Sequence, residues 1–179
     1  MDNGKISVRY ARALLHQAVG ERCADEVYSC LTRLTANYSL AISQFNEALS
    51  NPMAGGEEKK LLLITAIGEP VHPLVIRFIE FLIAKKRENK VFLIALKYQE
   101  MYRKANNILR ADVTTAMAVD DTTLRQIQTF VEQTFHCAVE LHAKVDPSLI
   151  GGFTLDIEYE RMDASVTGQL NKLKKELNL

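Results

Sequence analysis

The spacing of apolar residues changes about two thirds of the way along the chain. As far as about Leu109 they recur every three or four residues, and beyond it they recur mostly every two. The first spacing is that of helices with one buried face, and the second is that of half-buried strands. The sequence therefore predicts an α+β protein with two domains, a helical one over residues 1–105 and a small α/β one over residues 106–179.

The N-terminal domain is predicted to form a bundle of six helices. Gly20 is suited to end the first helix, Asn51-Pro52 ends the third, and Pro73 fits the first turn of the fifth. Short connections between the helices favour a compact bundle. The predicted helices are Ile6–Val19, Asp25–Tyr38, Leu40–Leu49, Glu57–Ile67, Leu74–Lys86 and Val91 to about Asn107.

The fifth predicted helix is apolar on most of its sides, and we therefore expect it to be buried almost all round. Two interpretations of this excess of apolar surface stay open. The helix is either simply the core of the bundle, or it shares a groove with a neighbouring helix into which a partner helix docks. Its apolar residues are Leu74, Val75, Ile76, Phe78, Ile79, Phe81, Leu82 and Ile83.

The C-terminal domain is predicted to follow a β-α-β-β-α order. Asp120 and Asp121 are suited to cap a helix that carries Leu124, Ile127, Val131 and Phe135 on one face. Glu160-Arg161-Met162 then serves only as a link to the last helix. Alternating residues predict strands from Ile108 to Val119, from Ala138 to Val145 and from Phe153 to Glu160.

The last predicted helix opens at Asp163 or Ser165 and carries a narrow apolar seam. This seam consists of Val166, Leu170, Leu173 and Leu177, at spacings of four, three and four residues. The spacing suits packing on the domain's own sheet equally well as packing on a coiled-coil-like partner helix. The sequence leaves both interpretations open.

The charges point to proteins, rather than nucleic acid or lipid, as partners. The chain has 22 Lys and Arg and 22 Asp and Glu, so its formal net charge is zero and it offers no overall positive field to phosphates. The longest uncharged apolar stretch near the middle, Leu61–Gly68, is too short to cross a bilayer. The first residues lack an apolar signal core. We expect a cytoplasmic protein with reduced cysteines at positions 23, 30 and 137.

No pattern of residues predicts a catalytic, cofactor-binding or metal-binding site. His136, Cys137 and His142 are close in sequence, but Cys137 and His142 face opposite sides of the predicted strand and no second motif accompanies them. Gly151-Gly152 precedes a strand, whereas a phosphate-binding loop precedes a helix, so a tight turn is the better interpretation. An enzyme housed in the α/β part and a helical nucleic-acid-binding regulator are both disfavoured, and a two-domain protein-binding adaptor remains.

Four segments carry a resemblance to a known family. Asp146-Pro147-Ser148-Leu149-Ile150-Gly151-Gly152-Phe153 and Asp163-Ala164-Ser165-Val166-Thr167-Gly168-Gln169-Leu170 resemble the C-terminal signature of the delta subunit of bacterial F-type ATP synthases, a family that includes the mitochondrial oligomycin-sensitivity-conferring protein. Val8-Arg9-Tyr10-Ala11-Arg12-Ala13-Leu14 is similar to its opening helix, and Phe81-Leu82 with Arg87 to its fifth. Lys85-Lys86-Arg87 departs from the Asn-Gly-Arg of many members, and Glu160-Arg161-Met162 lacks their glycine.

The resemblance implies a noncatalytic stator subunit at the cytoplasmic face of the bacterial cell membrane, held there through its complex. Its helical domain is expected to receive the N-terminal helix of an alpha subunit between the first and fifth helices, on Tyr10, Ala13, Leu14, Arg77 and Phe81. Its α/β domain is expected to meet the b subunits of the peripheral stalk, on Gly151, Gly152, Ser165, Val166 and Leu170. The structural alternative is that Gly151 permits a positive φ and that Val166 and Leu170 fill the domain's core. Neither a cofactor nor nucleic acid is implied.

Overall fold

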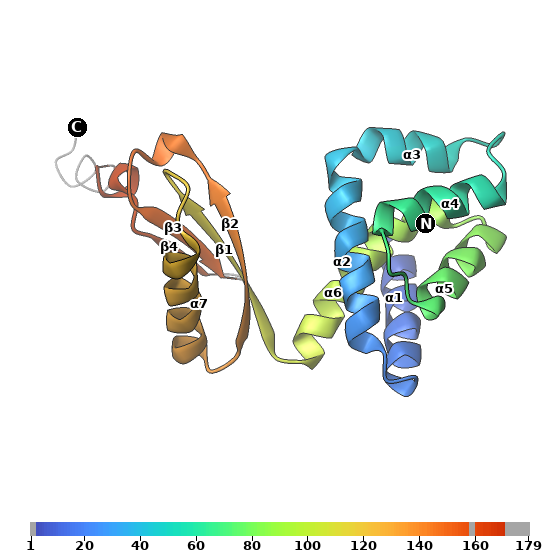
Figure 1. Cartoon of the computed structure of the whole chain (residues 1–179), viewed down its shortest axis with the longest axis horizontal. Helices are drawn as coiled ribbons and strands as arrows, with labels where there is room; N and C mark the ends of the chain where they lie inside the picture. Colours follow the sequence, from blue (N-terminus) through green and yellow to red (C-terminus); the bar gives the residue numbers. More distant parts are fainter. Residues whose placement is uncertain (1–2, 158–159, 171–179) are drawn as a thin grey trace. The chain divides into compact units, whose positions relative to one another are not determined.

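The computed structural model describes residues 3–157 and 160–170 of the 179-residue chain, and it confirms the α+β class. The chain divides into two compact units, Met1–Arg103 and Lys104–Leu179, which are called the helical unit and the sheet unit below. Helices make up the first unit, and a mixed four-stranded sheet organises the second (Figure 1). Within the described ranges, no helix combines the length and the apolarity that a membrane crossing requires.

The helices of the first unit cover the six segments that apolar spacing predicts. A single turn of 3-10 helix, Glu88–Lys90, joins the last two of them. The helices are α1 Asn3–Gly20, α2 Ala24–Leu40, α3 Ile42–Ser50, α4 Gly56–Ile67, α5 Pro73–Ala84 and α6 Val91–Ala105.

The end of α1 differs from the sequence prediction. Gly20 is still helical, and Arg22 is the residue that takes the left-handed conformation, with φ 57°. The backbone N–H groups of Arg22 and Cys23 return to the carbonyls of Val19 and Ala18, at 3.1 and 2.9 Å. This pair of bonds is a Schellman motif, so backbone hydrogen bonding rather than a glycine ends α1.

The core of the helical unit contains large aromatic side chains. Tyr38 is fully buried, and its ring stacks on Phe45 and on Phe92 with centroids 4.7 Å apart in each pair. Burial raises the pKa of both Tyr38 and Tyr98. Gln99 is also buried, and its amide donates to the Leu31 carbonyl at 3.0 Å and to Thr35 Oγ1 at 2.8 Å. The amide group of Gln99 is therefore hydrogen-bonded where it enters this core, as a stable interior requires.

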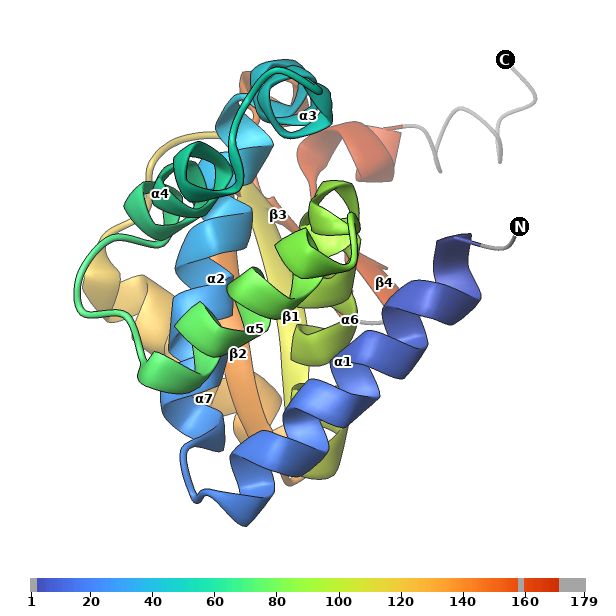
Figure 2. The ribbon, with the colours of Figure 1, turned by 90° about the vertical axis from the view of Figure 1, so that its right-hand side faces the viewer.

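The prediction that α5 is buried almost all round is wrong. Leu74, Val75, Ile79 and Leu82 are buried, but Phe81 is 45% exposed. Figure 2 looks onto this unit, in which α5 packs against α4 and comes close to α1. The helix therefore has one open face, and Phe81 stands on it.

The sheet unit places β1 Ile108–Thr115, α7 Asp121–Phe135, β2 Ala138–Val145, β3 Phe153–Ile157 and β4 Glu160–Asp163 in that order. The strand order across the sheet is β2-β1-β3-β4, with β1 and β2 parallel and the other pairs antiparallel. A 3-10 turn, Pro147–Leu149, lies between β2 and β3, and residues 166–170 are helical.

The segment Glu160–Met162 is not a link, as the sequence predicts, but part of the edge strand β4. Met162 pairs with Leu155 and Arg161 with Asp156. The segment carries one apolar side chain among charged ones, so its sequence has no alternating pattern that would reveal a strand. Tyr159, Leu173 and Leu177 lie outside the described residues.

The core of the sheet unit is small and lies between the sheet and α7. Its buried residues are Ala111, Val113, Val131, Val139, Leu155 and Ile157. The opposite face of the sheet is charged: register places Asp112 between His142 and Asp156, and Asp156 beside Arg161. Successive residues of a strand point to opposite sides of the sheet. One face therefore has ion pairs, and the face toward α7 has apolar side chains.

Candidate protein-binding surfaces

Helices α1 and α5 meet at an aromatic junction. The rings of Tyr10 and Phe81 lie 5.9 Å apart, centroid to centroid. Arg87, just beyond α5, donates from Nη1 to the Tyr10 hydroxyl at 2.8 Å, and its guanidinium lies 5.3 Å from the centre of the same ring. Arg87 and Phe81 thus both contact Tyr10 and hold its ring in place. Phe81, at the open face of α5, therefore packs against a ring that is already fixed.

A second contact joins the start of α5 to the turn after α1. Arg77 Nη2 donates to both carboxylate oxygens of Glu21, at 3.1 and 3.0 Å. The amide of Gln17 also donates to Glu21, at 2.8 Å. The hydrogen bond from Gln17, and with it the Arg77 charge, holds the pKa of Glu21 below its usual value. Both groups are solvent-exposed, so this pair orients the two helices more than it stabilises them.

The five residues expected to receive an alpha-subunit helix occupy different positions along these helices. Tyr10 and Phe81 are in contact, and Arg77 lies at the Glu21 end. Ala13 is exposed to solvent, whereas Leu14 is buried in the core beneath. Ala13, Arg77 and Phe81 are consequently the exposed part of the surface, Tyr10 is half-buried beside them, and Leu14 supports them from the core.

Sequence reasoning missed Glu21 and Arg87 as members of this surface. Each is bound to a residue 56 or 77 positions away along the chain, and no local pattern reveals such pairings. The turn that positions Arg87 holds Lys86 at φ 53°, with the N–H groups of Lys86 and Arg87 bonded to the Ile83 and Leu82 carbonyls. Lys86 thus adopts a conformation that costs glycine nothing, at the position where many members of the resembled family have glycine.

In the sheet unit, two of the expected stalk residues hold a loop against the start of the last helix. Gly152 has φ 76°, and a Cβ there would collide with the Ala164 carbonyl. Gly151 does not have the positive φ expected of it; the positive values belong to Ile150 and Gly152. A Cβ on Gly151 would lie 3.2 Å from Val166 Cγ2. The two glycines therefore permit the loop before β3 to approach the chain at Ala164–Val166 closely. This packing explains why glycine stands at both positions, and no partner protein is needed to explain it.

Ser165 is the N-cap of the last helix. Its Oγ accepts from the Gly168 N–H at 2.9 Å and donates to Asp163 Oδ1 at 2.6 Å. The side chain is fully buried, so its role is to begin the helix in a fixed direction. The Val166 N–H also donates to the Gly151 carbonyl at 3.0 Å, which ties the helix to the loop.

Val166 and Leu170 do not fill the core, contrary to the structural alternative drawn from the sequence. They are 40% and 48% exposed. The core lies between the sheet and α7, and the helix that bears them begins on the other side of the sheet, beside Asp163. Ile150, at the tip of the adjoining loop, is 71% exposed although it is β-branched and held at φ 65°. These three apolar side chains are open to contact.

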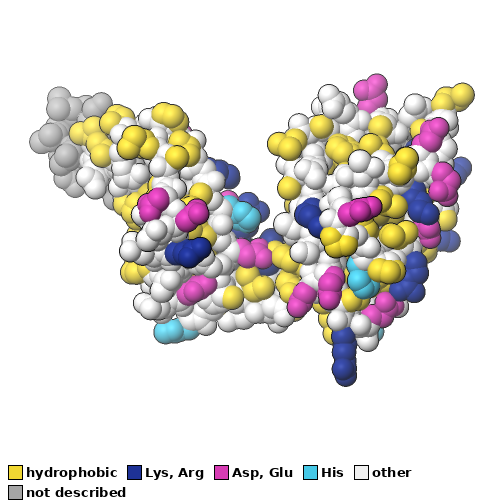
Figure 3. Space-filling model, in the orientation of Figure 1, with side chains coloured by type: hydrophobic (Ala, Val, Ile, Leu, Met, Phe, Trp, Pro, Cys, Tyr) yellow, Lys and Arg dark blue, Asp and Glu magenta, His cyan; other side chains and the backbone are white. Residues whose placement is uncertain are grey.

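The polar residues suggest no reaction centre. In the ranges that the structure covers, His, Cys, Asp and Glu side chains do not gather in threes at a distance suited to a metal ion. Cys23 and Cys30 are buried thiols, and burial raises the pKa of Cys23. On the face that Figure 3 shows, positive and negative side chains are intermixed.

Comparisons with known proteins agree over almost the whole chain. The family described as ATP synthase delta (OSCP) subunit matches residues 6–177. A protein of Parabacteroides distasonis named ATP synthase subunit delta is 38% identical over 174 residues, which cover 97% of this chain and 96% of that one. A protein of the same name from Synechococcus elongatus is 31% identical, with 92% and 91% covered. A chain of the Toxoplasma gondii mitochondrial ATP synthase hexamer has a similar fold, with a TM-score of 0.70, 20% identity and 97% of each chain covered.

Proposed function

This chain belongs to the ATP synthase delta (OSCP) subunit family, and from this membership we propose that it is the stator subunit that links the catalytic head to the peripheral stalk of an F-type ATP synthase. The observation that carries the conclusion is the match of the family over residues 6–177, which includes both units. The link prevents the head from turning with the rotor, so the subunit transmits force and catalyses no reaction of its own. It is attached to the membrane, on the cytoplasmic face, only through its complex.

The helical unit is the part proposed to hold the head. The N-terminal helix of an alpha subunit would lie along the α1–α5 surface, with its apolar side on Tyr10, Ala13 and Phe81. The fixed ring of Tyr10 and the exposed ring of Phe81 support this proposal, because rigid aromatic side chains lose little entropy when they are buried by a partner. Arg77 would add a polar contact at one end. Its bond to Glu21 means that a partner carboxylate must compete with an existing ion pair.

The sheet unit is the part proposed to hold the b subunits of the stalk. On the residues carried over from the resemblance, the contact would involve Val166 and Leu170, which the structure leaves exposed. Gly151, Gly152 and Ser165 would act indirectly, since they fix the loop and the first turn of the helix that bears these side chains.

Calorimetry with the full chain tests the head contact. A synthetic peptide of the alpha-subunit N-terminus from the same organism is titrated into the wild type and into Phe81→Asp. A charge placed in an apolar contact must be desolvated, so we expect binding to weaken about 100-fold. Affinity for the wild type is expected to change little between low and moderate salt, because apolar area rather than exposed ion pairs carries the binding.

Phe130→Asp is the matched control for that experiment, since Phe130 is also an exposed aromatic residue but lies in the sheet unit. It should bind the alpha peptide as the wild type does. Undiminished binding by Phe81→Asp would remove the α1–α5 surface from the account while leaving membership of the family untouched.

A further inference from the structure

The first turn of α5 is capped by a histidine side chain. His72 precedes Pro73, and its Nδ1 accepts a hydrogen bond from the Leu74 backbone N–H at 3.2 Å. The side chains that usually cap helices accept through an oxygen atom. An imidazole nitrogen, in contrast, accepts only while it carries no proton. The start of α5 therefore depends on the charge of one residue.

The geometry of this bond fixes which nitrogen of the ring carries the proton. Because Nδ1 accepts from Leu74, the neutral ring holds its single N–H at Nε2. In the imidazolium both nitrogens carry hydrogen, so Nδ1 and the Leu74 N–H would meet as two donors. Leu74 is buried, and a buried N–H without a partner is costly. A positive charge at the N-terminus of a helix is also unfavourable. Protonation of His72 therefore removes the cap.

Carboxylates beside His72 offer the imidazolium a different set of partners. The hydrogen bond from Gln17, together with the charges of Arg77 and His72, lowers the pKa of Glu21, so His72 lies within electrostatic reach of that carboxylate. His72 also lines a hollow of about 570 Å³ between α2 and the loop that precedes α5. This hollow gives the ring room to turn. Its acidic residues, both in the first turn of α2, are Asp25 and Glu26.

The other charged and titratable groups around His72 hold the loop in place. Arg33 of α2 donates from Nη2 to the Pro70 carbonyl at 2.6 Å, and the Cys30 sulfur lies 3.8 Å from the same oxygen. Arg77 is engaged in its ion pair with Glu21. Figure 2 shows the loop passing beside α2 on its way from α4 to α5. The backbone at Pro70 is thus tied to α2, and the imidazole can change its partner without movement of the loop.

We propose that His72 is a positioning residue whose protonation controls the start of α5. Neutral His72 caps the helix and fixes the first turn, from which the helix continues to Arg77 and Phe81. Protonated His72 releases the Leu74 N–H and turns toward Glu21 and the carboxylates of α2. The surface proposed to receive the alpha-subunit helix then loses its fixed start as the pH falls through the range, about 6.5, in which imidazoles take up a proton. This last step rests on the proposed function, whereas the loss of the cap does not.

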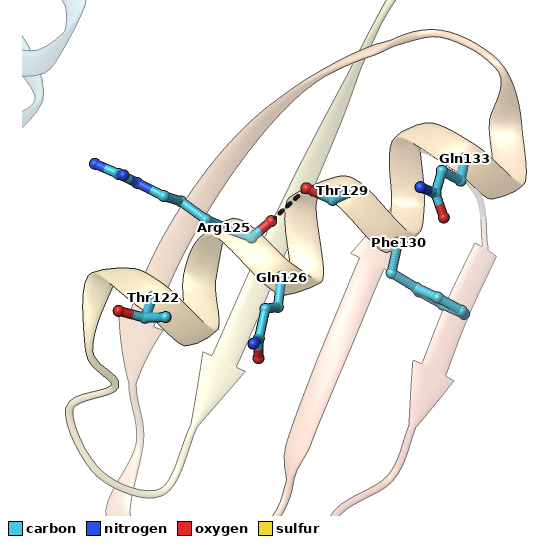
Figure 4. A pocket seen from close by; sticks show the side chains of 6 residues that line it. All are labelled: Thr122, Arg125, Gln126, Thr129, Phe130 and Gln133. Atoms are coloured by element: carbon cyan, nitrogen blue, oxygen red, sulfur yellow. Dashed lines mark hydrogen bonds between the residues drawn. The ribbon is translucent and has the colours of Figure 1, made fainter.

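Helix α7 provides a contrast within the same chain. It follows Asp120, whose Oδ1 accepts from Thr123 Oγ1 at 2.6 Å. This bond lowers the pKa of the Asp120 carboxyl group, so the group stays ionised throughout the range in which histidines titrate. Figure 4 shows the first turn of α7 at Thr122. The start of α7 should therefore not change where the start of α5 does.

Nuclear magnetic resonance of the full chain tests the loss of the cap. Between about pH 7.5 and about pH 5.5, the Leu74 amide signal should shift with the same midpoint as the His72 ring, because one proton controls both. The protection of this amide against exchange, corrected for the ordinary pH dependence of exchange, should fall about fivefold. The amides in the first turn of α7 supply the control in the same spectra.

Two substitutions at His72 fix the start of α5 in one state each. His72→Asn keeps a capping oxygen that does not titrate, so its Leu74 amide should stay unchanged over this pH range. Calorimetry with the alpha-subunit N-terminal peptide should give this variant the same affinity at both pH values. His72→Ala has no cap at any pH and should bind a few-fold more weakly at both. The wild type should resemble His72→Asn at the higher pH and His72→Ala at the lower.

His16→Asn and His142→Asn are the matched controls, since they remove exposed histidines from the helical unit and from the sheet unit. Both should keep the pH profile of the wild type. Unchanged circular dichroism of each variant excludes unfolding as the cause of a loss, and the titration of the wild type needs no substitution.

The outcomes separate this inference from the proposed function. Titration of the His72 ring without a change at Leu74 would overturn the inference, and so would a pH profile of binding that His16→Asn abolishes. A change at Leu74 without a change in peptide affinity would overturn the positioning role. Failure of the wild type to bind the peptide at either pH would remove the proposed head contact, and the Leu74 spectra would still decide the inference about the cap.

Discussion

The two units bury their cores in different ways. Among the residues that the structure describes, the twelve largest fully buried side chains, which include Tyr38, Tyr98 and Ile79, belong to the helical unit. The sheet unit has a core of six buried apolar residues and one helix over part of a four-stranded sheet. The helical unit thus has the larger core, whereas in the described part of the sheet unit one helix covers only part of the sheet. We expect the first to be the more stable and the second to gain stability when it binds.

This difference suits a joint between two bodies under load. A finished unit can offer a rigid surface with a few fixed aromatic side chains, as at Tyr10 and Phe81. An unfinished unit can incorporate a partner helix into its own core, and this couples binding to folding of the unit. Removal of a bound helix would expose the core of the sheet unit to water again. The free energy needed to separate the two would therefore include part of the free energy that stabilises the sheet unit.

The largest effect on this comparison is expected from Gly152→Ala. The residue has a positive φ, and a Cβ would collide with the backbone at Ala164, so the loop or the helix after it must move. We expect a loss on the order of 3 kcal/mol, confined to the sheet unit. Limited proteolysis should show cleavage in the sheet unit with the helical unit intact. Gly20→Ala, where nothing lies within 4 Å of the added Cβ, is the control and should not increase cleavage.

A cavity in the larger core is expected to have an effect of similar size, but in the other unit. Leu34 is fully buried, and Leu34→Ala should lower the unfolding free energy of the helical unit by about 3 kcal/mol. Near-ultraviolet circular dichroism follows this unit, which holds five of the six tyrosines. Leu141→Ala, at a partly buried position of the sheet unit, should leave that signal unchanged. A shift of equal size for both variants would mean that the two units unfold as one.

A smaller gain is expected at the turn after α5. Lys86 has φ 53°, and Lys86→Gly should raise the stability of the helical unit by roughly 1 kcal/mol, because a left-handed residue with a Cβ is strained and glycine is not. Thermal unfolding of the helical unit measures this gain. The control Lys85→Gly, one position earlier at φ −91°, should bring no such gain. A lower melting temperature for Lys86→Gly would show that the Lys86 side chain makes a contact worth more than the strain.

The smallest effect concerns pH and the charged face of the sheet unit. Partial burial opposes ionisation of Asp112, but hydrogen bonds from Arg110 and the charges of Arg110 and Lys144 prevail and lower its pKa. A lowered pKa means that ionised Asp112 stabilises the fold above the ordinary value near 4, and that this contribution is lost as the pH falls through the lowered pKa. We expect less than about 1 kcal/mol, since solvent screens these side chains. Acid titration of Asp112→Asn should show a correspondingly shallower loss of stability; an unchanged slope would contradict this.

The parts of the fold that the sequence predicts are those governed by local periodicity. Apolar spacing located the helices α1 to α6, and alternation located β1 and β2. The sequence does not predict strand β4, because Glu160–Asp163 holds one apolar residue among charged ones and so shows no apolar alternation. The sequence also does not predict that α1 ends at Arg22. A Schellman motif depends on backbone hydrogen bonds, and a residue other than glycine can make them at the cost of a strained positive φ.

The surfaces were less predictable than the fold because they depend on which side of an element faces the core. Val166 and Leu170 have the spacing of a buried seam, yet the described turn lies on the face of the sheet without a large core. The sequence does not predict the exposure of Phe130, since one aromatic residue on an amphipathic helix has no distinctive pattern. The structure shows that Phe130 is exposed beside a part of the sheet that α7 does not cover.

ATP-driven proton pumping by membrane vesicles is the most direct test of the stator role. Vesicles stripped of this chain should still hydrolyse ATP but should not acidify, and addition of the purified chain should restore acidification. The double variant Phe81→Asp/Leu170→Asp should fail to restore it, because it lacks both proposed contacts. Full pumping by vesicles that contain none of this chain would contradict the account.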